Sequence, residues 1–199
     1  MHFRSYLYLN KKHNHVLFPH TNLTQDKNDM MWKLVLKYNC SPESRKFQLT
    51  FPMEEEKYFH FILQKIKENK KIKKKSLRKR FFCNGIFIGE KSCDIHKGHY
   101  NIIVFDSYRM VLERYEPYGY QEDDSKLRKT LDTELFQVFQ KYGLKIKVRP
   151  PSAFMSKNSL QSIEEFYELP KGKGTEKPSD PFGFCGVWGT FLVDQRLSY

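Results

Sequence analysis

The sequence predicts one α+β domain, in which a small mixed β-sheet packs against a C-terminal helix and further helices lie outside. Two apolar runs, residues 100–105 and 110–116, flank a turn and predict a β-hairpin. A leucine stripe over 125–142 and an apolar face over 185–197 predict two helices. With 199 residues the chain is long enough for one sizeable core. We expect residues 1–80 to be a variable N-terminal part of that domain and 81–197 to be its core.

The first half of the chain gives weaker signals. Short apolar runs such as Trp32–Leu36 predict short strands or helical turns. From Pro52 a helix is predicted, because three glutamates suit the positive end of its dipole. Its apolar residues recur at spacings of three and four, at Phe59, Ile62 and Ile66.

This helix leads into a strongly basic tract. The whole chain carries a net charge of +12, and residues 65–80 alone hold ten lysines and arginines against one glutamate. Such a run is usually a solvated helix end, but this density also favours nucleic-acid binding or a nuclear-import signal. The candidate nucleic-acid-binding residues are Lys70, Lys71, Lys73, Lys74, Lys75, Arg78, Lys79 and Arg80.

The middle of the chain, from Phe81 to Tyr120, is predicted to be sheet. Asp106–Arg109 is the turn of the hairpin. His99 enters the first hairpin strand and Glu116 leaves the second, so both residues are expected at the open end of the hairpin.

The last third of the chain begins with a helix over 125–142, which Gly143 ends as a C′ residue, and a short strand over 144–148. A long irregular stretch then runs to Gly183, and connections of that length are usually functional or mobile. In the last helix, Cys185 falls in the first turn. The predicted apolar face of that helix consists of Val187, Trp188, Phe191 and Leu192.

The four cysteines are far apart and form no CxxC pair, and the N-terminus has no apolar signal-peptide core. We therefore expect free thiols in an intracellular protein with no membrane span. Cys83, Cys93, His96 and His99 lie close together in the sequence, but their spacing matches no common zinc finger. We expect neither a metal nor a cofactor.

One cysteine has the surroundings of a nucleophile. A helix N-terminus and a neighbouring imidazolium both lower the pKa of a thiol, and a carboxylate orients the imidazole. Cys185, His99 and Glu116 are such a set. The alternative is that Cys185 is an inert buried thiol, which is the commoner role of a lone cysteine.

The sequence motifs that contain these residues resemble those of a known family. Gly98-His99-Tyr100-Asn-Ile-Ile-Val104 is similar to the His-aromatic strand of adenovirus-type and SUMO-deconjugating proteases, and Phe184-Cys185-Gly186-Val187-Trp188 resembles their nucleophile motif. The family places its acid about 17 residues after the histidine, which here is Glu116. Two further segments resemble proteins of large DNA viruses, Arg114-Tyr-Glu-Pro-Tyr-Gly119 and Asp180-Pro-Phe-Gly-Phe-Cys185.

The resemblance covers roughly residues 81–197 and implies a papain-like fold and a cysteine peptidase. Cys185 attacks a peptide or isopeptide carbonyl, His99 is its base and Glu116 orients His99. The implied partner is a protein substrate, either a viral polyprotein or capsid precursor or a ubiquitin-like conjugate. The implied location is the host cytoplasm or nucleus, or the virion. DNA is a second candidate partner, through the basic tract.

The chain departs from the family at the oxyanion hole. The family has a glutamine about six residues before the cysteine, where this chain has Ser179 and Asp180. Gln161 lies 24 residues upstream of Cys185 and is the first candidate donor, with Asp180 second and the backbone N–H of Cys185 available in either case. This departure leaves open a protease-like scaffold without activity, acting as a nucleic-acid-binding or interaction protein.

A second carboxylate, Glu113, competes for the role of the acid. It lies three positions before Glu116, so on a regular strand the two side chains face opposite sides of the sheet. The family spacing and the following Pro117 favour Glu116.

Overall fold

A computed structural model describes residues 8–9, 11–17, 32–38, 45–50, 55–74, 78–91, 96–119, 125–157 and 184–199. Within these ranges the backbone alone is described for residues 32–38, 45–50, 87–91, 96–100, 125–128 and 184–186.

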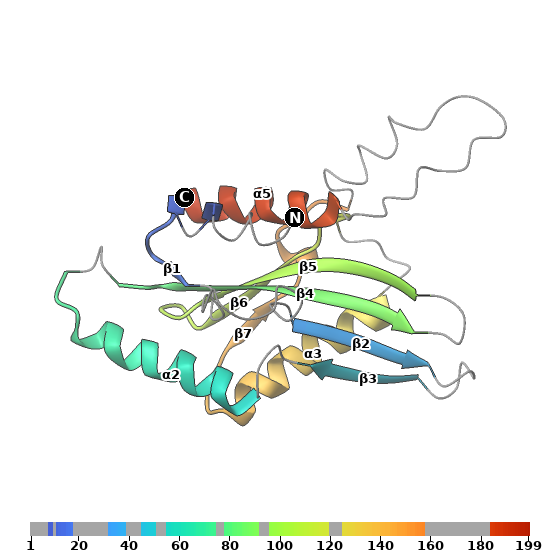
Figure 1. Ribbon diagram of the computed structural model, residues 1–199, viewed down its shortest axis with the longest axis horizontal. Helices are drawn as coiled ribbons and strands as arrows, with labels where there is room; N and C mark the ends of the chain where they lie inside the picture. The colour runs from blue at the N-terminus through green and yellow to red at the C-terminus, as the bar shows by residue number, and fades with distance from the viewer. Residues whose placement is uncertain are drawn as a thin grey trace.

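The described residues form one mixed sheet of seven strands with helices on both faces (Figure 1). The strand order is β3-β2-β4-β5-β6-β7, and the two-residue β1 pairs with the start of β4. β5 is antiparallel to both of its neighbours, β4 and β6, whereas β2 runs parallel to β4 and β7 parallel to β6. The strands are β1 Val16–Leu17, β2 Trp32–Tyr38, β3 Arg45–Thr50, β4 Phe81–Lys91, β5 His96–Asp106, β6 Val111–Tyr115 and β7 Lys147–Arg149.

The predicted α+β class is therefore confirmed, but the sheet is larger than the small one expected. The segment before Phe81 supplies β1, β2 and β3 to the same sheet. No helix among the described ranges combines the length and apolar character that a bilayer crossing requires.

The central hairpin forms as predicted, with β5 and β6 joined through residues 107–110. Asp106 fixes the turn, because its Oδ1 accepts hydrogen bonds from the backbone N–H groups of Tyr108 and Arg109. Arg80 donates two hydrogen bonds to the same carboxylate from the adjacent end of β4. This local chemistry explains how so short a turn holds the long strand β5 against β6.

The predicted helices are present as α2 (Glu55–Lys71), α3 (Ser125–Lys141) and α5 (Phe184–Ser198). The end of α3 is a Schellman motif with Gly143 at φ +74°. The N–H of Gly143 donates to the carbonyl of Gln140, and the N–H of Leu144 donates to the carbonyl of Phe139. The prediction that Gly143 is the C′ residue of this helix is confirmed.

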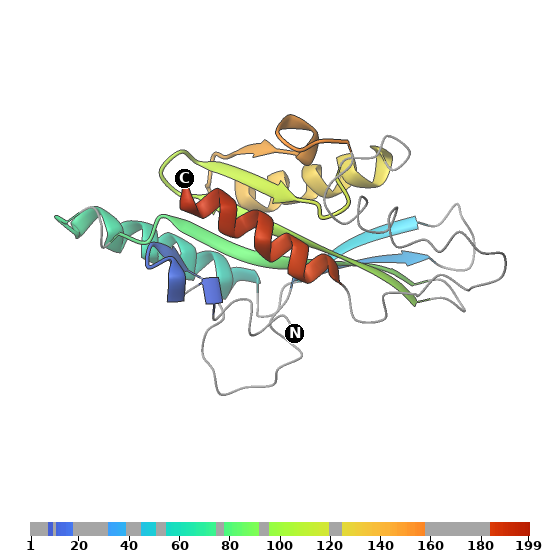
Figure 2. The same cartoon turned by 90° about the horizontal axis from the view of Figure 1, so that it is seen from above.

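The sheet separates two cores. Below it, α2 and α3 pack their apolar faces around Phe59, Phe105 and Phe139, whose rings meet edge to face. Above it, α5 and the N-terminal segment (residues 8–17, described except for residue 10) cover the other face. Figure 1 shows α5 on one side of the sheet and α2 and α3 on the other, and Figure 2 shows α5 crossing over β4 and β5. The upper core consists of Leu9, Val16, Phe81, Cys83, Ile102, Val104, Tyr115, Val193 and Leu197.

The predicted apolar face of α5 is wrong at Val187 and Phe191, whereas Leu192 packs against the upper core as expected. Val187 and Phe191 are 41% and 45% exposed, whereas Gly189, Val193 and Leu197 are buried against the sheet. The helix is apolar on most of its circumference, so periodicity alone does not select the buried side. The buried side is the one that carries Gly189, because the absence of a side chain there lets the helix approach Ile102 of the sheet closely.

Candidate active site

The three residues proposed for the triad lie on three neighbouring pieces of this fold. His99 is in the first half of β5, where it pairs with Ile88 of β4. Glu116 directly follows β6, and Cys185 is the second residue of α5. The side chains of His99 and Cys185 lie outside the described part of the structure, so the geometry available is that of their backbone positions and of Glu116.

Glu116 sits in a tight turn at the end of β6. The N–H of Gly119, at φ +83°, donates to the carbonyl of Glu116, with Pro117 at the second position of the turn. The side chain is 2% exposed, and its Oε1 accepts a hydrogen bond of 3.2 Å from the backbone N–H of Tyr118. The turn therefore fixes both the backbone and the carboxylate of Glu116.

The contacts of Gly189 locate the start of α5 relative to this turn. A Cβ on Gly189 would lie 3.1 Å from Cδ1 of Ile102 in β5 and 3.6 Å from Cγ of Pro117. α5 thus touches β5 and the residue next to Glu116 at one point. Farther along, Arg196 bonds to Glu113 of β6, so the helix runs in the same direction as β5.

Cys185 and His99 both precede the contact between Gly189 and Ile102, so both lie on the same side of that contact. Cys185 is one helical turn before Gly189, a rise of about 6 Å. His99 is three residues before Ile102, about 10 Å along the strand. The fold therefore brings the first turn of α5, the first half of β5 and the Glu116 turn to one corner of the sheet.

Glu113, the competing carboxylate, has a different role in the structure. It lies on the α5 face, where it accepts hydrogen bonds from Arg149 at 2.8 Å and from Nε of Arg196 at 2.8 Å. The hydroxyl of Tyr115 donates to its Oε2 at 3.0 Å. The expectation that Glu113 and Glu116 face opposite sides of the sheet is confirmed, because Glu116 instead bonds to Asn101 on the α3 face.

Cys83 is the cysteine whose side chain the structure describes. It is buried in the upper core beneath α5, and burial raises the pKa of its thiol far above the usual range. An inert thiol of this kind contrasts with the helix-start position of Cys185. Among the side chains that the structure describes, no group of three potential metal ligands is found.

Other predicted site residues lie outside the described residues. These are Gln161 and Asp180, the two candidate oxyanion donors, together with Ser179 and Lys75.

The basic tract separates into two parts. Lys70, Lys71, Lys73 and Lys74 are exposed at and just beyond the end of α2. Arg78 donates to the carbonyl of Ile72, Lys79 to the carbonyl of Asn14, and Arg80 to Asp106. The last three candidates therefore hold the chain itself together at the entry to β4.

The sequence reading missed the polar residues around Glu116. Asn101 is fully buried and donates from Nδ2 to Oε2 of Glu116 at 3.0 Å. Arg114 donates to Oδ1 of Asn101 at 2.9 Å and makes two hydrogen bonds to Asp132 of α3. The signal available was a polar residue inside an apolar strand, Asn101 between Tyr100 and Ile102, and an arginine inside β6.

No known protein-family profile matches the chain. The chain is similar to an ankyrin repeat protein of Acanthamoeba polyphaga mimivirus, with 31% identity over 111 residues. The match takes in 51% of this chain and 14% of the viral protein, so about half of this chain is similar to a small part of that relative.

Proposed function

We propose that this chain is a cysteine peptidase with a papain-like fold, of the adenovirus-protease and SUMO-deconjugase type. The observation that carries the proposal is the meeting of α5, β5 and the Glu116 turn around Gly189, Ile102 and Pro117. A helix start beside a strand that carries histidine, with a fixed carboxylate next to it, is the arrangement that Cys–His–acid chemistry requires.

In the proposed reaction the thiolate of Cys185 attacks the carbonyl carbon of a peptide or isopeptide bond. His99 takes the thiol proton and gives it to the leaving amine as the C–N bond breaks, and Glu116 holds the imidazole. Water then hydrolyses the thioester and releases the acid product and the thiol. Backbone amides and Gln161 are the proposed oxyanion donors.

The proposed substrates are precursor proteins of a large DNA virus, with ubiquitin-like conjugates as the alternative. The similarity to a mimivirus protein supports the viral substrate. The relative's name refers to ankyrin repeats, yet the described residues of this chain form a mixed sheet with helices on both faces.

A thiol-alkylation experiment tests the proposal without a known substrate. The folded chain is treated with iodoacetamide at pH 7, and the labelled cysteines are identified by mass spectrometry. We expect Cys185 to react about tenfold or more faster than the remaining thiols, because a helix start and an imidazolium stabilise its thiolate. His99→Ala should reduce that rate to the rate of an ordinary exposed thiol.

Cys83 is an internal control for folding, because its buried thiol should be labelled only after unfolding. If Cys185 in the folded protein reacts no faster than Cys40 or Cys93, the chain is not a cysteine peptidase.

One observation favours a second function, nucleic-acid binding by a scaffold without peptidase activity. Lys70, Lys71, Lys73 and Lys74 lie exposed together at the end of α2, and no ion pair within the described ranges involves them. Because each phosphate contact releases counterions, the slope of log K against log salt measures such binding, at about 0.9 per contact.

The test of this second function is the salt dependence of binding to a short DNA duplex, followed by fluorescence anisotropy. Replacing the four lysines with alanine should reduce the slope by about 3.6 if each lysine contacts one phosphate. The matched control replaces four exposed lysines elsewhere, Lys11, Lys129, Lys145 and Lys147, and should change it by about one or less. Equal losses in the two variants would mean that only the net charge matters and that the end of α2 is no binding site.

A further inference from the structure

A buried chain of hydrogen bonds connects the candidate acid to helix α3. Asp132 of α3 accepts from Nε of Arg114 at 2.7 Å and from its Nη2 at 2.9 Å. Nη1 of Arg114 donates to Asn101 at 2.9 Å, and Asn101 donates to Glu116 at 3.0 Å. Arg114, Asn101 and Glu116 are each at most 2% exposed. These bonds occupy the interior of the protein between α3 and the sheet.

We call the hydrogen-bonded chain Asp132–Arg114–Asn101–Glu116 the relay. The chemistry of arginine fixes the direction of each of its hydrogen bonds. A guanidinium can only donate, so the oxygen of the Asn101 amide must face Arg114. The NH₂ group of the same amide must then face Glu116, which has to accept. The other oxygen of Glu116 accepts from the N–H of Tyr118 at 3.2 Å. Both oxygens therefore accept a hydrogen bond, an arrangement that stabilises the ionised form of a carboxylate.

The groups near Glu116 include an ion pair, a neutral amide and a separate charged network on the opposite face of β6. Arg114 and the partly exposed Asp132 form a bidentate ion pair that compensates the buried charge of Arg114. Asn101 is neutral, so it transmits orientation to Glu116 without neutralising it. Glu113, Arg149 and Arg196 form their own network on the opposite face of β6. On the remaining side, the N–H of Glu116 is against the sulfur of Met155.

We propose that Asp132, Arg114 and Asn101 are positioning residues that hold Glu116 ionised and correctly turned toward His99. This inference rests on the proposed peptidase function. Its physical basis is that a buried amide with both ends committed has one orientation, so the carboxylate it holds also has one. The packing of α3 against the sheet thereby determines the orientation of the Glu116 carboxylate.

The test is the pH dependence of Cys185 alkylation in the full chain. Asn101→Asp keeps the size of the side chain but places a second carboxylate oxygen against Glu116. Two adjacent carboxylates cannot both ionise easily, so one retains a proton and less negative charge faces His99. The acid limb of the alkylation profile should move upward by about one pH unit, a tenfold loss of rate on that limb.

A merely structural role would lower stability without moving the profile. Phe105→Leu is the matched control, since it shortens a buried side chain of the same strand and pairs with Leu112, outside the relay. It should cost some stability and leave the acid limb where it is in the wild type. A folded Asn101→Asp variant with the wild-type profile would overturn the proposal.

Asp132→Asn is the second variant, for the case in which Asn101→Asp does not fold. The Asp132 side chain is partly exposed, so the substitution is milder. It leaves the charge of Arg114 uncompensated, which opposes the imidazolium and should move the acid limb in the same direction by a smaller amount. If the acid limb of the alkylation profile does not move in Asp132→Asn, that result also contradicts the proposal. The proposed function fails on a separate result, a wild-type Cys185 that is not selectively reactive, and the relay fails with it.

Discussion

At the scale of single residues, two buried glutamates three positions apart have different surroundings. Glu113 is on the α5 face and is bonded to two arginines and a tyrosine. Burial and the neighbouring Glu113 charge raise the pKa of Tyr115, so its hydroxyl is a donor at neutral pH. Glu116 is on the α3 face at the corner where α5 begins. The first arrangement ties three elements together, and the second holds a carboxylate against Asn101 and the N–H of Tyr118.

Glu113→Gln should therefore affect stability and leave reactivity intact. The glutamine NH₂ group would meet an arginine donor, and the two guanidinium groups would lose their shared anion. We expect the free energy of unfolding to fall by about 2–3 kcal/mol, measured by urea denaturation. The rate of Cys185 alkylation in the folded protein should stay within about twofold of the wild type.

The control is Glu56→Gln at an exposed position of α2, which should change the free energy of unfolding by about 0.5 kcal/mol or less. A Glu113→Gln variant that remains folded but loses the fast reaction of Cys185 would identify Glu113 as the acid in place of Glu116.

At the scale of the elements, local patterns predicted α2, α3, α5 and the β5–β6 hairpin. Each has its signal within a few residues, such as the apolar spacing of α2 or the glycine that ends α3. The buried side of α5 could not be predicted in this way. Its orientation depends on Gly189 meeting Ile102, and these residues are 87 positions apart in the sequence.

The same limit applies to the candidate site. The positions of His99, Glu116 and Cys185 followed from short motifs and from a family resemblance. The parallel pairing of β2 with β4 and the relay from Asp132 to Glu116 depend on contacts between distant segments. An arginine in a strand shows that a buried partner is required, but the sequence does not identify the partner.

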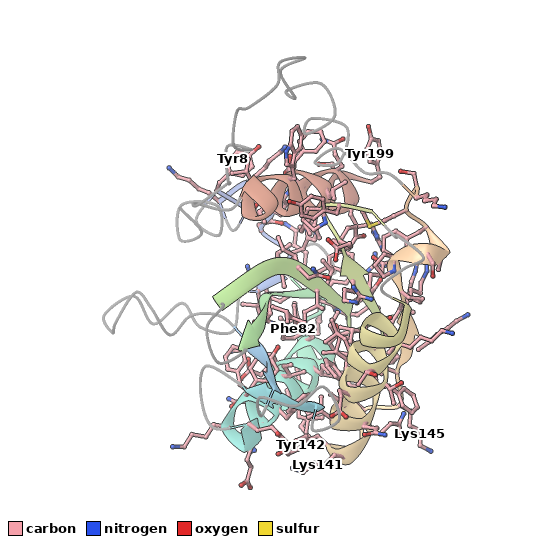
Figure 3. All side chains as sticks on the ribbon, turned by 90° about the vertical axis from the view of Figure 1, so that its right-hand side faces the viewer. Tyr8, Phe82, Lys141, Tyr142, Lys145 and Tyr199 are labelled. Carbon is pink, nitrogen blue, oxygen red and sulfur yellow. The ribbon has the colours of Figure 1, made fainter. Side chains whose placement is uncertain are left out.

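At the scale of the whole molecule, the two ends of the described chain are joined over the sheet. Asp194 of α5 accepts from Nζ of Lys12 at 2.7 Å, and Nε2 of His13 lies 2.7 Å from its other oxygen. Leu9 and Val16 of the N-terminal segment pack with Val193 and Leu197 of α5. Figure 3 shows Tyr8 and Tyr199 on the α5 side of the sheet, with Tyr142 on the α3 side. The N-terminal segment is thus part of what holds α5 in place.

The contacts of Lys12 and His13 with Asp194 predict a pH-dependent contribution to the free energy of unfolding. Burial alone would raise the pKa of Asp194, but the hydrogen bonds from Lys12 and His13 outweigh burial and hold that pKa below its usual value of 3.8. A carboxylate with a lowered pKa stabilises the fold above its unfolded pKa, and the stabilisation is lost as the pH falls through the folded pKa. Asp194→Asn should therefore cost about 2 kcal/mol at pH 7.

The measurement is urea denaturation of the wild type and of Asp194→Asn at several pH values between 3 and 7. Contributions from the other carboxylates are common to the two proteins, so the difference between their free energies of unfolding isolates Asp194. That difference should shrink as the pH falls from about 5 to below about 4. Gln195→Ala, at the exposed neighbouring position, should show no such trend. A difference that grows toward low pH would mean that the Asp194 carboxylate does not hold the N-terminal segment against α5.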